Sequence, residues 1–141
     1  MNSPLFTSTP RQQQIGIAAL RIILGIVMTA HGYQKLFTMG IAGVQDGFTQ
    51  MGVPLPMISA PLVAGLEFFG GLALIVGLLT RLTALGLAID MLGAISFVHI
   101  SNGFFAPKGY EFVLMLMAAS LSLALAGPGA YSIDELLARK K

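Results

Sequence analysis

Four long runs of apolar residues, separated by short polar segments, dominate the chain, and they cover approximately residues 15–37, 59–79, 82–100 and 110–126. A helix needs about 20 apolar residues to cross the hydrocarbon core of a bilayer. Because backbone polar groups must be satisfied inside the bilayer, and the runs are too long and evenly apolar for barrel strands, each run predicts a transmembrane helix. Short connections between them favour an antiparallel four-helix bundle.

Two shorter helices are predicted outside these runs. Val44, Phe48 and Met51 recur at helical spacing after the first run, which favours a short amphipathic helix on the outer face, with a Gly-rich loop as an equal alternative. Ser132 and Glu135 have the spacing of a capping box and predict a short C-terminal cytoplasmic helix. Its basic end, at Arg139, Lys140 and Lys141, matches the helix dipole and suits anionic lipid head groups. The first 14 residues are polar and predicted to be irregular.

Composition supports the membrane assignment. Of 141 residues, 55% are hydrophobic and 10% are charged, whereas a soluble domain carries about 25% charged residues. Length and uniform patterning predict an all-α protein with a single membrane domain over residues 1–141. The absence of cysteine excludes disulfides, thiolate catalysis and iron–sulfur ligation by this chain. The net charge of +2 comes from basic residues near the ends of the runs, so nucleic acid is not a predicted partner, whereas the lipid bilayer is.

The distribution of lysine and arginine predicts the orientation. Four spans place both termini on one side, which then carries Arg11, Arg21, Arg81, Arg139, Lys140 and Lys141. The other side carries only Lys35 and Lys108. The positive-inside rule therefore predicts cytoplasmic N- and C-termini, with Arg81 as a topology anchor in a tight turn.

Ionisable residues recur at the outer ends of the predicted helices. Glu67 lies in a run otherwise free of charge, where a carboxylate is costly unless it is paired, protonated or wetted. The first two helices run in opposite directions, so His31 and Glu67 are predicted to lie at similar depth in the outer half of the bundle. We therefore predict one ligand or proton cluster formed by His31, Lys35, Glu67, His99 and Glu111.

Small residues accompany the acidic ones. Gly70 and Gly71 share a helix face with Glu67, which predicts a close helix contact there. Gly86 and Gly93 share the face of Asp90 in the same way. Asp90 and His99 are nine residues apart and fall on opposite faces of a regular α-helix, so Asp90 is predicted to make a separate, deeper contact, with a subunit interface as one alternative.

Each polar residue also has a structural interpretation. Glu67 can form a pair with His31 or Lys35 that locks the bundle, Lys35 can extend to the outer surface, and His99 and Glu111 can contact lipid head groups. A haem between His31 and His99 is disfavoured because the spacing carries no diagnostic motif. A metal site using His31, Glu67, His99 and Glu111 has suitable ligand types but is equally disfavoured, so no metal site is predicted.

The chain resembles the DoxX family in four segments that follow in order. HGYQKLF at 31–37 is similar to the first-helix motif, and GLEFFGGLALIVGLLTRLTAL at 65–85 to the second-helix motif and following turn. VHISNGFF at 98–105, followed by Tyr110 and Glu111, resembles the third loop, and GPGAYSID at 127–134 the closing motif. The matching positions are His31, Gly32, Lys35, Glu67, Gly71, Arg81, His99, Gly103 and Glu111, whereas Asp90 is not part of the pattern.

The resemblance implies a four-helix protein of the bacterial inner membrane. Some relatives resemble membrane subunits of thiosulfate:quinone oxidoreductase, and another is associated with a membrane oxidoreductase complex. Two functions follow as alternatives. The first is an accessory or anchoring subunit that holds a partner, as part of an oxidoreductase complex or as a homo-oligomer. The second is a redox subunit that binds quinone or another small molecule and moves protons through His31 or Glu67, with Lys35 stabilising the anion. A small transporter is a third, weaker alternative because no broken-helix repeat is present.

Overall fold

The computed structural model describes residues 7–140, and every regular element among them is helical. The predicted irregular structure of residues 1–6 and the predicted role of Lys141 lie outside these residues. The elements are α1 (Pro10–Tyr33), η1 (Gln34–Met39), α2 (Gly40–Gln50), α3 (Pro56–Val76), α4 (Thr80–Ala94), η2 (Ile95–His99), η3 (Ile100–Asn102), α5 (Glu111–Ala126) and α6 (Ile133–Ala138). The predicted all-α class is therefore confirmed.

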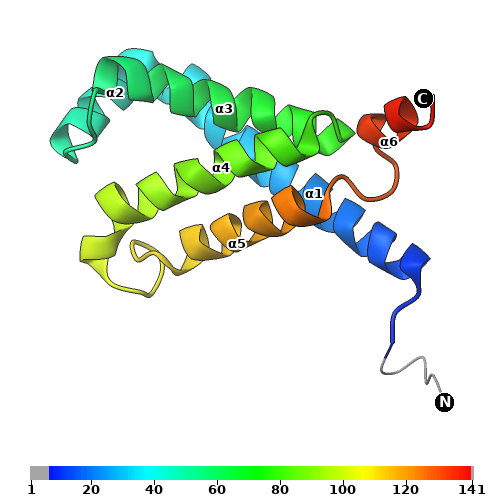
Figure 1. Ribbon diagram of the computed structural model, residues 1–141. Coiled ribbons are helices and arrows are strands. Elements are labelled where there is room, and N and C mark those ends of the chain that lie inside the picture. The colour runs from blue at the N-terminus through cyan, green and yellow to red at the C-terminus, as the bar shows by residue number, and fades with distance from the viewer. Residues whose placement is uncertain (1–6, 141) are drawn as a thin grey trace.

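The long helices pack in two pairs that form one bundle (Figure 1). The most extensive contacts join α1 to α3 and α4 to α5, and further contacts between α3 and α4 connect the pairs. Three segments, Pro10–Gln50, Pro56–Val76 and Thr80–Asn102, are long and apolar enough to cross a membrane. The apolar helix α5 is shorter, with 16 residues. The start of α1 and the short helix α6 lie at one end of the bundle, and α2 lies at the other (Figure 1).

Apolar side chains cover the outside of this bundle as well as its inside. Leu62 on α3, Leu82 on α4 and Leu125 on α5 are among many large apolar residues that remain exposed. In water such a surface would be unfavourable, whereas in a bilayer it contacts lipid. A compact core joins all four long helices, formed by Leu24, Met28, Leu74, Ala84, Leu87, Met91, Val113 and Leu123.

The first helix begins earlier than the apolar pattern predicted. Thr9 is its N-cap and accepts a hydrogen bond from the backbone nitrogen of Gln12, whose side chain in turn accepts from the backbone nitrogen of Thr9. Pro10 follows in the first turn, where its missing N–H costs little. This capping box starts the helix at Pro10, so the prediction of irregular structure up to residue 14 was wrong.

The predicted bounds of the next two helices also shift. α3 begins at Pro56, three residues before the predicted start, which leaves Pro61 inside the helix. It ends at Val76 because Gly77 adopts a left-handed conformation, with φ 73°, that suits glycine at a helix C-terminus. α4 begins at Thr80 rather than Leu82 because the Asp134 carboxylate accepts hydrogen bonds from the backbone nitrogens of Leu79 and Thr80, both at 2.8 Å.

The crossing of α1 and α3 depends on glycines in both helices. A Cβ atom added at Gly32 would overlap the backbone of Phe68, and one added at Gly25 would lie 2.7 Å from the carbonyl oxygen of Gly71. Neither position leaves room for a side chain. Small residues therefore bring the two backbones together, as they do in many membrane helix pairs.

The end of the bundle near α6 is held by a buried arginine. Arg21 is fully buried and donates five hydrogen bonds to backbone carbonyl oxygens. Two acceptors belong to Leu74 and Ile75 near the end of α3, and three belong to the segment 128–131 that leads to α6. Arg21 thus satisfies carbonyl groups that a helix end and a loop would otherwise bury unpaired.

Arg81 has a similar role at the end of α5. Its Nη1 donates to the carbonyl oxygens of Ala124 and Leu125 at 3.0 and 2.8 Å. The residue predicted as a topology anchor therefore also caps a helix C-terminus, where a positive charge is favourable. Ser132 is the N-cap of α6 as predicted, but the Glu135 carboxylate pairs with Arg139 at 2.6 Å instead of completing the capping box.

Candidate ligand site in the membrane bundle

A cavity of about 370 Å³ opens between α2, α3, α4 and η2 at the end of the bundle away from α6. Its polar side chains belong to Lys35, Ser59, Glu67, Asp90 and His99, and we call it the carboxylate cavity. Its apolar wall is formed by Phe48, Met51, Val53, Pro54, Val63, Ile89, Phe97 and Val98. Small-molecule sites commonly have this size and this composition, a mostly apolar lining with a few convergent polar groups.

The strongest polar contact in the carboxylate cavity joins η1 to α3. Lys35 Nζ lies 2.5 Å from Glu67 Oε2, and the two side chains are 20% and 5% exposed. A pair between Glu67 and either His31 or Lys35 was one of the predicted alternatives, and the structure contains the Lys35–Glu67 pair. The extension of Lys35 to the outer surface is therefore wrong, because the ammonium group turns inward to neutralise a buried carboxylate.

Asp90 lies beside this ion pair rather than apart from it. Its side chain faces both Glu67 and Lys35, and it lines the same cavity as His99. The prediction of a separate, deeper contact was therefore wrong. It assumed regular α-helical geometry from Asp90 to His99, whereas Ile95–His99 is a π-helix whose wider turn changes the angle between the two positions.

Two polar atoms in the carboxylate cavity are buried without a hydrogen-bond partner: Ser59 Oγ and Asp90 Oδ2. Buried polar atoms are almost always paired, so an orphaned oxygen needs an explanation. Charge points to the same place, since two carboxyl groups line the cavity and the Lys35 ammonium group pairs with only one of them, Glu67. The site therefore has spare capacity to hold a proton or a hydrogen-bonding ligand.

Both π-helices of the described chain deliver a side chain to this cavity. Lys35 belongs to η1 and His99 belongs to η2. A π-turn inserts an extra residue into a helix and re-aims the side chains around it, and such turns are frequent at functional sites. His99 Nδ1 lies 2.9 Å from the carbonyl oxygen of Lys108. A carbonyl only accepts, so Nδ1 donates, and Nε2 of the neutral ring remains an acceptor.

Two of the five residues predicted for the cluster lie elsewhere. His31 Nδ1 donates to the carbonyl oxygen of Val27 at 2.9 Å, and its ring packs 6.2 Å from Phe112 on α5. Glu111 Oε1 accepts from the backbone nitrogen of Ala106 at 2.7 Å and stabilises the loop before α5. Neither lines the carboxylate cavity. Similar predicted depth did not imply proximity, because His31 packs against α5 and Glu111 binds the loop before its own helix.

The four glycines predicted to pack helices divide into two groups. Gly71 meets α1, and a Cβ at Gly70 would lie 3.1 Å from Thr83 Cγ2 on α4. A Cβ at Gly86 would meet only the flexible end of Leu66, at 3.4 Å. Gly93 has nothing within 4 Å of such an atom and lines the carboxylate cavity. Gly93 therefore leaves space for the cavity instead of closing a helix contact.

Sequence reasoning missed Ser59 and the apolar wall from α2 as parts of the site. The spacing of Val44, Phe48 and Met51 left a helix and a Gly-rich loop as equal alternatives, and the structure has the helix α2, with Met51 as its C-cap. Val44 is buried, while Phe48 and Met51 line the cavity. Among the described residues, no group of three or more His, Cys, Asp or Glu side chains is arranged to hold a metal ion.

Comparison with known proteins gives consistent relatives. The chain is 41% identical to "Inner membrane protein YqjF" of Escherichia coli, over 91% of this chain and 96% of that one. It is 31% identical to "Putative oxidoreductase CatD" of Bacillus subtilis, over 91% of each chain. It is 29% identical to "Uncharacterized membrane protein Rv3486" of Mycobacterium tuberculosis, over 88% of this chain and 82% of that one. No solved structure matches the chain significantly.

Family membership follows from these matches and from the fold. Residues 16–100, which extend from the second turn of α1 through η2, match the sequence profile of the DoxX family. The segment contains both partners of the Lys35–Glu67 pair and the other polar residues of the carboxylate cavity. Its relatives named as inner membrane proteins support a bacterial inner membrane location. The chain belongs to the DoxX family of integral membrane proteins.

Proposed function

We propose that this protein is an accessory subunit of a membrane oxidoreductase and that it binds a quinone-like molecule in the carboxylate cavity. The relative named as an oxidoreductase supports the reaction class. The location supports the ligand class, because a quinone partitions into the apolar phase that surrounds the bundle. The two functions predicted from the sequence are thereby joined: the chain is an accessory subunit because it supplies a binding site.

The observation that carries the proposal is the pair of unpartnered oxygens in the carboxylate cavity. Asp90 Oδ2 and Ser59 Oγ are buried and face a space of about 370 Å³ with a largely apolar wall. A quinone ring presents two carbonyl oxygens on a flat apolar body, which suits a site with few donors and much apolar surface. The Ser59 hydroxyl, the Lys35 ammonium and the protonated carboxyl group of Asp90 are donors for those carbonyls.

The proton chemistry of a quinone fits the same residues. Its reduction to the quinol takes up two electrons and two protons. We assign the electrons to a partner subunit of the oxidoreductase class and the proton exchange to the carboxyl groups of Asp90 and Glu67. Lys35 stabilises the anionic form while the proton is in transit. The proposed role of His31 is withdrawn, because its ring contacts Phe112 and not the cavity.

The membrane arrangement of the site is part of the proposal. We take α5 as the fourth membrane span of a single domain over residues 1–141 and both termini as cytoplasmic. The carboxylate cavity then lies in the outer half of the membrane, at the end of the bundle opposite α6.

The test is extraction of bound molecules from protein purified in mild detergent. Wild-type protein is compared with Asp90→Asn, which removes the proton-accepting group at nearly constant volume. We expect quinone in the wild-type extract by mass spectrometry and about tenfold less in the variant. Ser122→Ala is a matched control, because Ser122 is exposed and bonds only within its own helix, to Ala118.

A purely anchoring function gives a different result. It predicts a retained partner protein, no quinone in the wild-type extract and no difference between the variants. That outcome would contradict quinone binding.

A further inference from the structure

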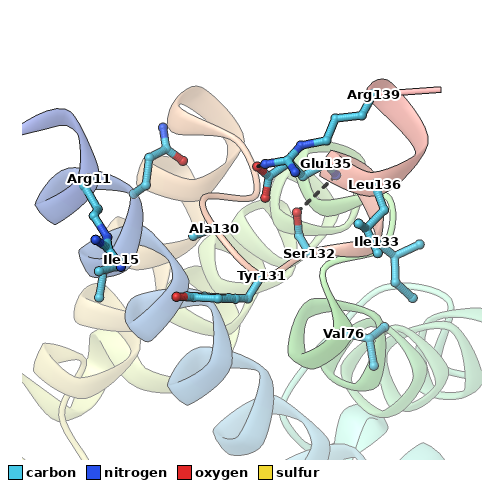
Figure 2. A pocket seen from close by; sticks show the side chains of 11 residues that line it. Arg11, Ile15, Val76, Ala130, Tyr131, Ser132, Ile133, Glu135, Leu136 and Arg139 are labelled. Atoms are coloured by element: carbon cyan, nitrogen blue, oxygen red, sulfur yellow. Dashed lines mark hydrogen bonds and ion pairs between the residues drawn. The ribbon is translucent and has the colours of Figure 1, made fainter. Parts of the chain in front are cut away.

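A second groove, of about 500 Å³, lies at the opposite end of the bundle between the start of α1 and α6. Figure 2 shows Arg11 and Ile15 on its α1 side and Ile133, Leu136 and Arg139 on its α6 side. Tyr131 extends between the two sides from the loop before α6 (Figure 2). None of these residues belongs to the carboxylate cavity.

The charge in this groove is positive. It contains two guanidinium groups, from Arg11 and Arg139, and one carboxylate, from Glu135. Arg139 pairs with Glu135 at 2.6 Å, whereas Arg11 has no hydrogen-bonding or ion-pairing partner among the described residues. One arginine is therefore available to an anion at once, and the second becomes available when Glu135 is displaced from an exposed pair.

Tyr131 is held in a conformation that a tyrosine seldom adopts. Its φ is 56°, in the left-handed region. Its carbonyl oxygen and that of Ala130 both accept hydrogen bonds from Arg21, at 3.0 and 3.1 Å. The buried arginine thus fixes the loop and directs an exposed aromatic ring across the groove. Tyrosine suits such a place because its ring packs against apolar chains while its hydroxyl reaches water.

We infer that this groove binds an anionic phospholipid. Its phosphate is held between Arg11 and Arg139, and its acyl chain follows the apolar side chains of Ile15, Ile133 and Leu136. Basic pockets between membrane helices recognise acidic lipid head groups in this way. The exposed apolar lining favours a lipid over a soluble phosphate, because a free anion would use the arginines and leave Ile15 and Leu136 in water.

The experiment measures retained lipid by native mass spectrometry of the full chain in detergent. Protein is titrated with phosphatidylglycerol, with phosphatidylcholine, and with inorganic phosphate in separate series. We expect selective retention of phosphatidylglycerol. Arg11→Gln should weaken this retention about fivefold, as expected for one arginine near a lipid phosphate. Glu135→Gln should strengthen it, because Arg139 loses its competing partner.

A matched control separates the groove from general surface charge. Lys140→Gln removes one positive charge from the same end of the protein, and Lys140 does not line the groove. It should change retention by less than twofold. Equal losses in Arg11→Gln and Lys140→Gln, or no gain in Glu135→Gln, would overturn the site. If inorganic phosphate is retained as strongly as phosphatidylglycerol, the occupant is a soluble anion, and the assignment of a lipid is overturned.

Discussion

Lys35 Nζ lies 2.5 Å from Glu67 Oε2, and this ion pair joins the π-helix after α1 to the middle of α3. Asp90 on α4 faces the same pair. One ammonium group thus pairs with Glu67 and lies within electrostatic reach of Asp90, beside a cavity with an apolar wall. This arrangement connects the stability of the bundle to its proposed ligand site.

The loss of one carboxyl group should be partly compensated by the other. In Glu67→Gln, Asp90 remains near Lys35, so we expect the free energy of unfolding to fall by about 1 kcal/mol. In the double variant Glu67→Gln with Asp90→Asn, Lys35 is buried without an anion, and we expect a loss of about 3 kcal/mol or more. The measurement is denaturant unfolding in detergent. If the loss in the double variant equals the sum of the losses in the two single variants, the two carboxyl groups do not compensate for each other at Lys35.

Glu135→Gln provides the control for this cycle. It removes a carboxylate from an i,i+4 pair whose side chains are 72% and 37% exposed. Exposed ion pairs contribute little to stability, so the free energy of unfolding should change by less than about 0.5 kcal/mol.

Arg21 should tolerate no substitution, lysine included. A lysine has three donors and a flexible stem, so it cannot satisfy the five hydrogen bonds that the guanidinium makes to buried carbonyls. We expect Arg21→Lys to lower the free energy of unfolding by about 3 kcal/mol. Arg11→Lys, at an exposed position of the same helix, should have almost no effect. Equal stability of the two variants would mean that Arg21 is dispensable for the fold.

Glycine at position 32 should be required for the crossing of α1 and α3. Because an added Cβ would overlap the backbone of Phe68, Gly32→Ala should separate the helices and cost about 1–3 kcal/mol. Gly16→Ala is the matched control in the same helix, since nothing lies within 4 Å of its added Cβ. A wild-type melting temperature for Gly32→Ala would be incompatible with the close contact described here.

Hydropathy predicted the helices well because burial in lipid leaves a strong signal in composition. The ends were less predictable, since hydrogen bonds determine them. The start of α1 had a readable signal, because Thr9 and Gln12, three positions apart, form a capping box and Pro10 follows the N-cap. The start of α4 had none, because its cap is Asp134, which lies 55 positions further along the chain than Leu79.

The candidate site was predicted in part. The cost of a carboxylate in an apolar run correctly singled out Glu67, and helix-face geometry made Lys35 a candidate partner. The same geometry misplaced Asp90, because a π-helix follows α4 and hydropathy carries no signal for it. His31 and Glu111 were included because of their predicted depth, and depth does not determine whether a side chain packs against another helix, as His31 does, or binds the loop before its own helix, as Glu111 does.

The orientation of the bundle is a further prediction. Arg21 and Arg81 cap backbone carbonyls, but their charges still lie toward the end that carries α6. The positive-inside rule therefore predicts cytoplasmic termini. One reporter protein that is active only in the cytoplasm and one that is active only in the periplasm can each be fused after α6. We expect activity from the cytoplasmic reporter alone. Activity of the periplasmic reporter would show the opposite orientation or an odd number of spans.

The central claim is that the carboxylate cavity holds a quinone-like molecule, and a filled cavity tests it most directly. Gly93 lines the cavity with open space around it, so Gly93→Leu should occupy that space. Gly65→Leu is the matched control, because Gly65 also has open space but does not line the cavity. The measurement is titration of each folded variant with a soluble short-chain quinone. We predict wild-type affinity for Gly65→Leu and at least a tenfold loss for Gly93→Leu, and equal affinity of the two variants would contradict the site.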